Sequence, residues 1–320
     1  MLPALLSLLI SVSPVLAEDT DSIMVMSWNL ENYFDWKNDS TSVSDGEFSS
    51  RGVKRWTRRR VLSKSNAIAK TILFTADERG RLPDFICFQE VENARALKTL
   101  LNETALYKTD FRFIHRDSPD SRGIDVAILY RATKWIPDGI SAVQPKDSAG
   151  NILMTRDILS AGFSKKGETG PKLHIVACHL PSKYGGAAVS KPRREQAVMT
   201  LCQIADSLEA TAPAIICGDF NDVPSSETFA PINGRLRNLA LPFEARGEGT
   251  LRYKGVWEII DMFLISRSFQ NYNMEIPEIP FLMVRDRKYG GMKPLRTYSG
   301  PRYLGGVSDH RPILLEAELP

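Results

Sequence analysis

Polar side chains that can carry acid–base chemistry stand at the ends of short apolar runs in this sequence. Asn29 follows the run at 23–28. Glu90 comes at the end of the run in DFICFQEVEN, and His179 ends HIVACH. Side chains that follow strands lie in loops, where a rigid scaffold can bring them together into a site. Carboxylates and imidazoles in one pocket would bind a divalent cation and transfer protons near neutral pH.

The second half of the chain repeats this pattern. Asp219 and Asn221 follow the apolar run in AIICGDFND. Asp309 and His310 come directly before the last run, in GVSDHRPI. Asp261 lies inside EIIDMFLIS, with apolar neighbours on both sides. Because a buried charge is costly unless it is paired, Asp261 needs a partner, and a histidine would supply it.

These residue types suit the hydrolysis of a phosphodiester. That substrate is an anion that repels hydroxide, so a site must neutralise charge and hold one water in line. A metal ion can stabilise the leaving oxygen. Imidazoles that carboxylates hold in one tautomer can act as acid or base. No covalent nucleophile is required. Each residue alone is more often a turn, cap or structural residue, so the interpretation depends on the whole ordered set.

Strands must position these side chains. Apolar runs rich in β-branched and aromatic residues lie at 23–28, 84–89, 111–115, 125–130, 173–179, 213–217, 259–265 and 312–318. Helical spacing of apolar residues covers 57–74 and 192–209, and Asn93 is placed to cap a helix through Leu101. Strands at this density with few helices predict a four-layer α/β sandwich, in which helices flank two packed, mainly antiparallel β-sheets. The irregular stretch 281–306 leads into SDH, so we expect a functional role for it.

The composition is that of a globular protein. Of 320 residues, 43% are hydrophobic and 25% are charged, which excludes disordered and fibrous classes. No linker or repeat interrupts the chain, so we predict a single catalytic domain over 22–320 and a monomer.

Residues 1–17 are expected to be a signal peptide. Their apolar run, Leu5 to Val15, is too short to cross a bilayer, and the small residue Ala17 suits a cleavage site. The alternative is a buried N-terminal helix, although the run has no polar face. We therefore predict a secreted or periplasmic protein with no stable membrane insertion after cleavage.

Four cysteines in an exported protein would suggest disulfides. However, Cys87, Cys178 and Cys217 lie within apolar, strand-like runs, and Cys202 lies on a helical pattern. Free cysteine is commonly buried and behaves as a small apolar residue. We predict four unpaired, buried thiols.

The motifs WNLEN, QEVEN, GDFND and SDH occur in this order between Trp28 and Pro312. Together they resemble the endonuclease/exonuclease/phosphatase superfamily, which includes pancreatic deoxyribonuclease, abasic-site endonucleases, neutral sphingomyelinases and inositol polyphosphate phosphatases. SRGIDVAILYR and GTLRYKGVW resemble a bacterial exported subgroup. The resemblance implies that Glu90 is the principal metal ligand, helped by Asn29 and Asp309. Magnesium suits such an oxygen-rich site, with manganese or calcium as alternatives.

The same resemblance implies roles for the remaining motif residues. His310 would be the general base or a phosphate-stabilising group, held by Asp261. Asp219 would orient or deprotonate the attacking water, and Asn221 would bind a phosphate oxygen. His179 would donate to a phosphate oxygen or to the leaving group.

Substrate contacts are expected from Arg122, Ser182 and Lys183. Ser182 in HLPSKYGG resembles the histidine-Pro-Ser arrangement of pancreatic-type deoxyribonucleases. Those enzymes orient this histidine with a glutamate, and Asp125 is the nearest acid here. Glu31 stands where abasic-site enzymes have an aspartate, which leaves a metal role for it open.

The charge pattern fits a phosphate-bearing partner. Net charge is +3, and one basic cluster lies near the start of the first predicted helix: Arg51, Lys54, Arg55, Arg58, Arg59 and Arg60. It is either a solvated helix start or a contact for phosphates. We predict an exported nuclease that hydrolyses phosphodiester bonds with a metal ion. The alternative is a phosphatase or phosphodiesterase acting on a lipid head group or a small phosphate ester. The intact acid and histidine set argues against a binding module that has lost catalysis.

Overall fold

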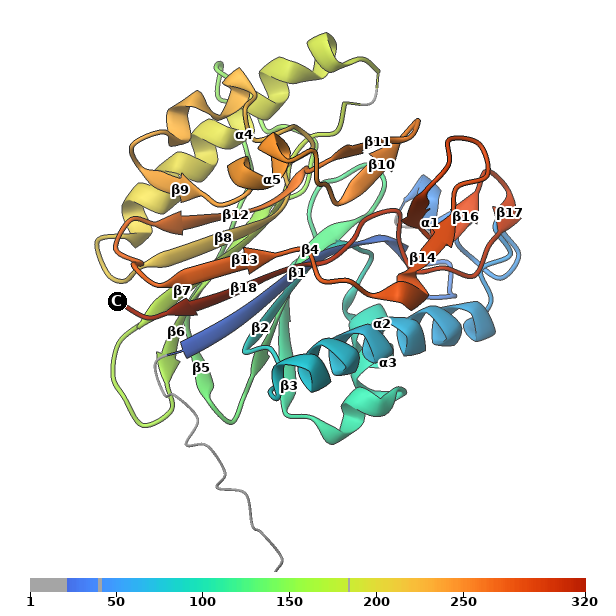
Figure 1. Ribbon diagram of the computed structural model, residues 1–320, viewed down its shortest axis with the longest axis horizontal. Coiled ribbons are helices and arrows are strands. Elements are labelled where there is room, and N and C mark those ends of the chain that lie inside the picture. Colours follow the sequence, from blue (N-terminus) through green and yellow to red (C-terminus); the bar gives the residue numbers. More distant parts are fainter. Residues whose placement is uncertain (1–21, 40–41, 184) are drawn as a thin grey trace, which may run out of the picture.

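Two six-stranded sheets pack face to face in the computed structural model, with helices on their outer faces (Figure 1). The structure describes residues 22–39, 42–183 and 185–320. The expected signal peptide, residues 1–17, lies outside the described residues.

The first sheet carries the N-terminal motifs. Its strands, in spatial order, are β13 (Tyr272–Glu275), β18 (Ile313–Glu318), β1 (Ser22–Tyr33), β2 (Phe85–Val91), β4 (Asp125–Arg131) and β3 (Phe111–His115). Only β1 and β2 pair in parallel, and the other neighbours are antiparallel. Both β1 and β2 are buried on their two faces, and this explains why their sequences are largely continuous apolar runs and do not alternate with polar residues.

The second sheet carries the central motifs. Its order is β5 (Trp135–Val143), β6 (Ile158–Lys165), β7 (Leu173–His179), β8 (Ala214–Asp219), β12 (Asp261–Ser266) and β9 (Leu236–Asn238). Here β7 and β8 form the one parallel pair. The prediction of two packed, mainly antiparallel sheets flanked by helices is therefore confirmed.

Three longer helices cover the sandwich. In Figure 1, α2 (Arg58–Arg79) and α3 (Ala94–Asn102) lie on one outer side and α4 (Ala187–Leu208) on the other. Asn93 caps α3, as predicted, by accepting hydrogen bonds from two backbone amides of its first turn. The shorter helices are α1 (Val43–Glu47), α5 (Leu241–Ala245) and the 3₁₀ turns η1 (Ala105–Lys108), η2 (Glu227–Ile232) and η3 (Pro280–Leu282).

Three short hairpins lie in the C-terminal part of the chain, and the last two of them fall within the stretch 281–306 that the sequence indicated as irregular. They are β10 (Leu251–Tyr253) with β11 (Val256–Glu258), β14 (Met283–Arg285) with β15 (Met292–Pro294), and β16 (Tyr298–Ser299) with β17 (Arg302–Tyr303). Within the described part of the chain, no helix has the length and apolar character needed to cross a membrane.

The space between the sheets is an apolar core. Val25 and Cys87 from the first sheet belong to the same cluster as Ile175, Cys217 and Phe263 from the second. All four cysteines are buried and free, as predicted. Burial and a hydrogen bond with Cys217 raise the pKa of the Cys87 thiol well above its usual value. These thiols are therefore structural residues.

Candidate active site

Strand register brings the central motif residues together at one end of the sandwich. In the second sheet, Asp219 pairs with His179 on one side and with Asp261 on the other, so the three side chains share one face. From the first sheet, the Asn29 amide donates a hydrogen bond of 2.9 Å to Asp219 Oδ2. His310, just before β18, reaches Asp261. The site is thus built from both sheets.

Asp219 is the centre of this group. Its Oδ2 lies 3.4 Å from His179 Nε2 and 3.8 Å from His310 Nε2. Its Oδ1 accepts a hydrogen bond of 2.9 Å from the backbone amide of Asn221. Burial and the charge of Asp261 raise the pKa of Asp219 to about 7, although His310 opposes that shift. A carboxylate with this pKa can accept a proton near neutral pH.

His310 and Asp261 form the pair that the sequence predicted. His310 Nδ1 lies 2.8 Å from Asp261 Oδ2, which also accepts a hydrogen bond from the Thr250 hydroxyl. Burial alone would lower the pKa of His310, but the charge of Asp261 and this hydrogen bond raise it well above its usual value. Ser308 Oγ accepts the His310 backbone amide at 2.9 Å, which fixes the residue in place. The geometry therefore favours an imidazolium aimed at Asp219.

His179 has the opposite electrostatic character. Burial, together with the charges of Arg156, Arg122 and His310, lowers the pKa of His179 well below its usual value. Its Nδ1 has no hydrogen-bond partner among the residues that the structure describes. The acid considered for orienting it, Asp125, instead lies 3.3 Å from the imidazole of another histidine, so that hypothesis is wrong. The carboxylate beside His179 is that of Asp219, on the Nε2 side of the ring.

Asn221 and Gly218 show how the GDFND motif shapes the site. Asn221 adopts φ 53° and donates its side-chain amide to the Leu180 carbonyl at 3.0 Å. A Cβ atom on Gly218 would lie 1.8 Å from the Cys178 carbonyl oxygen. Only glycine therefore allows β7 and β8 to approach closely enough to place His179 beside Asp219.

The candidate metal ligands lie at the ends of β1 and β2. Glu90 adopts φ 62°, and its Oε2 accepts the Asn32 backbone amide at 2.8 Å. The Arg122 guanidinium lies 3.2 Å from the same oxygen and donates to Asn32 Oδ1 at 2.6 Å. Sequence reasoning assigned Arg122 to the substrate, whereas in the structure it also holds Glu90.

Two more carboxylates and two cations complete this region. Arg296 lies 2.8 Å from Glu31 Oε1 and 3.0 Å from Asp309 Oδ2, so it joins the two acids. Lys64 donates to the Glu31 carbonyl at 2.6 Å. Burial lowers the pKa of Lys64 to about 8, while the charges of Glu31, Glu90 and Asp309 oppose that shift. All three carboxylates therefore lie within electrostatic reach of one buried lysine.

These acids fit a divalent metal ion. Burial and the charge of Asp309 raise the pKa of Glu31 to about 7, although the charges of Arg296 and Lys64 oppose that shift. Oxygen donors of this kind are those that hard divalent cations prefer. Asn29 Oδ1 accepts the Glu31 backbone amide at 2.9 Å while its nitrogen donates to Asp219. Asn29 thus connects the acid region to the histidine region.

Sequence reasoning missed Lys64 and Arg296. Lys64 has a signal, because helical spacing places it with Val61 and Ile68 on the apolar, buried face of α2. A charged residue at such a position needs a partner. Arg296 has no comparable signal, since it lies in an irregular segment whose path depends on the whole fold.

A basic cleft lies next to His179. It has a volume of about 620 Å³ and is lined by Arg122, Arg156, Ser182 and Arg193, among others. The predicted contacts Arg122 and Ser182 therefore share one cleft. Lys183 is directed elsewhere, at 3.0 Å from Asp222 Oδ1.

Several residues of the basic cluster make internal contacts. Lys54 donates to the Gly300 carbonyl at 3.0 Å, and Arg58 forms an ion pair with Glu103. The Arg60 guanidinium lies 4.3 Å from the centre of the Tyr303 ring. At these positions the cluster connects α2 to its neighbours.

Comparisons with known proteins agree with this arrangement. The sequence profile described as the Endonuclease/Exonuclease/phosphatase family matches residues 24–318. Nocturnin from Drosophila melanogaster is 26% identical over 163 residues, which cover 48% of this chain and 24% of that protein. The match thus spans about a quarter of that relative's length.

Solved structures share the fold at low sequence identity. An endonuclease/exonuclease/phosphatase family protein from Bacteroides thetaiotaomicron has a TM-score of 0.59 at 17% identity, covering 93% of this chain and 98% of that one. The human Nocturnin catalytic domain with bound sulfate has a TM-score of 0.57 at 15% sequence identity, and the match covers 94% of this chain and 95% of that domain. The mannosyl-6-phosphatase of Bacteroides thetaiotaomicron has a TM-score of 0.57 at 18% sequence identity, and the match covers 92% of this chain and 99% of that one.

Proposed function

The chain belongs to the endonuclease/exonuclease/phosphatase family, and on that premise we propose that it hydrolyses phosphodiester bonds of nucleic acid with Mg²⁺. Members of this family are divalent-metal-dependent phosphoester hydrolases. The observation that carries the proposal is the position of Asp219, which adjoins His179, the His310–Asp261 pair and Asn29. One proton acceptor thereby adjoins both histidines and Asn29, which is one of the candidate metal ligands.

The carboxylates have two separate roles in this proposal: some bind the metal ion and one accepts a proton. Glu90 and Asp309, with Glu31 and Asn29 beside them, would hold the metal, which supplies charge neutralisation at the phosphate and leaving oxygen. Asp219, whose pKa is about 7, accepts the proton of the attacking water.

The two histidines differ in charge during the reaction. His310 is protonated, because its pKa is raised, and donates to a phosphate oxygen. Of the two roles that the resemblance allows for His310, phosphate stabilisation is therefore favoured over general base. His179 is neutral and donates Nε2–H to the phosphate or leaving oxygen. Asn221 lies on the loop after Asp219 and is proposed to contact the phosphate once its amide leaves the Leu180 carbonyl.

The basic cleft supports an anionic substrate. Arg122, Arg156 and Arg193 line it, and the first two lower the pKa of His179, so their charge acts at the catalytic group. Such a surface suits contact with a nucleic-acid backbone. Ser182 would donate to a backbone phosphate there. Lys183 lies outside the lining of the cleft and pairs with Asp222, so a substrate contact through it would require that ion pair to open.

The second candidate is a phosphatase or phosphodiesterase that acts on a lipid head group or a small phosphate ester. Two observations favour it: the cleft volume of about 620 Å³ is in the range of small-ligand sites, and a mannosyl-6-phosphatase shares the fold. We also propose that the protein is exported to the periplasm or the medium, because residues 1–17 resemble a signal peptide. A monomeric state is a separate part of the proposal.

A substrate screen separates the candidates. The purified protein is incubated with Mg²⁺ and, in separate reactions, with plasmid DNA, single-stranded RNA, sphingomyelin, inositol phosphates and sugar phosphates. The proposal predicts cleavage of a polynucleotide and little release of phosphate from monoesters. Release of inorganic phosphate from a monoester, or of phosphocholine from sphingomyelin, without cleavage of any polynucleotide would support the second candidate instead.

A further inference from the structure

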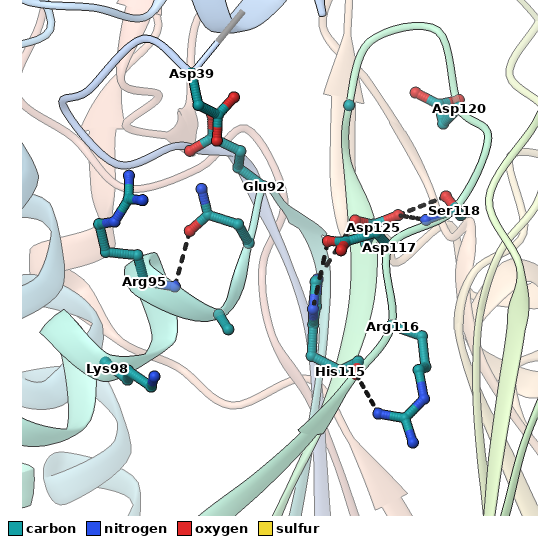
Figure 2. A pocket seen from close by; sticks show the side chains of 13 residues that line it. Asp39, Glu92, Arg95, Lys98, His115, Arg116, Asp117, Ser118, Asp120 and Asp125 are labelled. Carbon is teal, nitrogen blue, oxygen red and sulfur yellow. Dashed lines mark hydrogen bonds and ion pairs between the residues drawn. The ribbon is translucent and has the colours of Figure 1, made fainter. Parts of the chain in front are cut away.

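A second group of metal-binding side chains lies where β3 turns back into β4. His115 ends β3, Asp125 begins β4, and Asp117 lies in the loop between them. One potential ligand atom from each lies within 4.8 Å of the others. Figure 2 shows the three side chains meeting on the wall of a cavity of about 690 Å³. None of them has a part in the proposed hydrolysis.

The strand register creates this group. His115 pairs with Ala127 across the antiparallel ladder, so Asp125, two residues before Ala127, is its diagonal neighbour on the same face. Ser118 donates its backbone amide to Asp125 Oδ1 at 3.0 Å, and its hydroxyl donates to the same oxygen. Asp125 is thereby fixed with Oδ2 toward the imidazole. Such outer partners commonly orient the ligands of metal sites.

The imidazole of His115 is buried beside Asp125. The His115 side chain is 5% exposed, and its Nε2 makes no hydrogen bond within the described residues. It nevertheless lies 3.3 Å from Asp125 Oδ2. Two ligands of one ion with bonds of about 2.1 Å stand about 3.0–3.4 Å apart in octahedral or tetrahedral geometry. A separation of 3.3 Å is compatible with two atoms that bind one ion.

Further acids line the surrounding cavity. Glu92 and Asp39 also line it, and Glu92 Oε1 is buried without a hydrogen-bond partner in the described structure. Arg95, Lys98 and Arg116 line the same cavity, and contacts away from the three ligand side chains are made by Arg95 and Arg116. Arg95 pairs with Asp35 at 2.6 Å, and Arg116 donates to the backbone carbonyl of His115 at 3.1 Å. A bound cation would compensate the carboxylates.

We propose that His115, Asp117 and Asp125 bind a divalent transition-metal ion, with Zn²⁺ as the favoured occupant. Imidazole with carboxylates suits zinc better than magnesium, which prefers oxygen ligands alone. Three protein ligands leave at least one position for water from the cavity. Asp117, 88% exposed, would close over the ion from the loop.

The ion connects both ends of a loop that serves the active site. The segment 116–124 carries Arg122, which holds Glu90, and Asp120, which lies 3.1 Å from Arg156 Nη1. An ion at the ends of this loop restricts the positions of both arginine contacts. The ion would therefore restrain this loop, and the test of the site does not depend on the substrate of the hydrolase.

Calorimetric titration with zinc chloride tests the site. Asp117→Asn is the main variant, because the side chain is exposed and its replacement leaves the core unchanged. His115→Gln is the second variant. His174→Gln is the matched control. His174 lies on β7 of the other sheet and is also buried, but its imidazole is hydrogen-bonded to Thr211. Glu90→Gln controls for zinc bound by the candidate catalytic ligands.

The proposal predicts one zinc ion fewer per chain, or affinity weakened at least about tenfold, in Asp117→Asn and His115→Gln. His174→Gln and Glu90→Gln keep this zinc ion. At about a hundredfold excess over its Kd, zinc should raise the unfolding midpoint by about 5 °C in the wild type but not in Asp117→Asn. Equal zinc stoichiometry, affinity and midpoint shift in Asp117→Asn and wild type would overturn the proposal, whether or not His115→Gln folds.

Discussion

Replacing Asp261 with asparagine removes one charge from the catalytic group and almost none of its shape. Asp261 Oδ2 accepts hydrogen bonds from His310 Nδ1 and Thr250 Oγ1, and an asparagine oxygen in the same place can accept both. The asparagine nitrogen then occupies the position of Oδ1, which has no partner in the described structure. One buried, unpaired amide costs about 1–3 kcal/mol of folding free energy.

The catalytic effect should be much larger. Without the charge of Asp261, the raised pKa of His310 falls, since that charge opposes the effect of burial. The imidazole would then be neutral when it must stabilise the phosphate. Loss of a positioned acid or base lowers the rate by about two to four orders of magnitude. Asp261→Asn should therefore fold and be nearly inactive.

The pH dependence of stability provides an independent readout. The folded-state pKa of His310 is raised above the unfolded value of 6.5. Its contribution to stability is thus fully present below pH 6.5 and is lost as pH rises through the raised folded value. Urea unfolding across this range should show that loss in the wild type and a weaker dependence in Asp261→Asn.

Asp84→Asn is the matched control. Asp84 is a buried acid beside the first residue of β2, at the end opposite Glu90, where it accepts the Met24 backbone amide at 2.9 Å. Its replacement should destabilise the fold while kcat stays near the wild-type value. If Asp261→Asn retained more than about a tenth of wild-type kcat, or if Asp84→Asn lost as much activity, the assignment of Asp261 would be refuted.

Three further predictions concern the metal, the glycine and the thiols. Glu90→Gln keeps the shape of the side chain but removes its charge, so magnesium affinity and turnover should both fall at least about tenfold; wild-type activity at limiting magnesium would contradict this. Gly218→Ala should cost more than about 3 kcal/mol or prevent folding, because its Cβ would lie 1.8 Å from the Cys178 oxygen, and urea unfolding measures this. Thiol titration in denaturant without reductant should find four reactive groups; two or none would show disulfides.

Much of the sandwich follows from local pattern. β1, β2, β8 and β12 are buried along almost their whole length, so each is a short, continuous apolar run that the sequence displays. Most motif residues, Asp219 among them, lie at the ends of such runs, whereas Asp261 lies inside one. Asp261 was the most informative, because a charge among apolar residues requires a partner.

The rest depends on contacts that local pattern does not encode. The edge strand β5 is largely exposed, so its residues carry little apolar signal. Arg122 binds Glu90 only because the loop after β3 folds back over β2, and Arg296 meets Glu31 from 265 positions away in the sequence. The expectation that Asp125 orients His179 is wrong for the same reason, because the β3–β4 register places Asp125 beside His115.

The proton acceptor is the most direct test of the mechanism. Two aspartates of one motif, Asp219 and Asp222, are each replaced by asparagine, and kcat is measured with Mg²⁺ on the polynucleotide that the wild type cleaves. Asp219 adjoins both histidines, whereas Asp222 pairs with Lys183 and Arg194. We predict that Asp219→Asn lowers kcat by about two to four orders of magnitude and that Asp222→Asn lowers it less than about tenfold. Equal kcat values in the two variants, or an Asp219→Asn enzyme with near-normal turnover, would contradict the account.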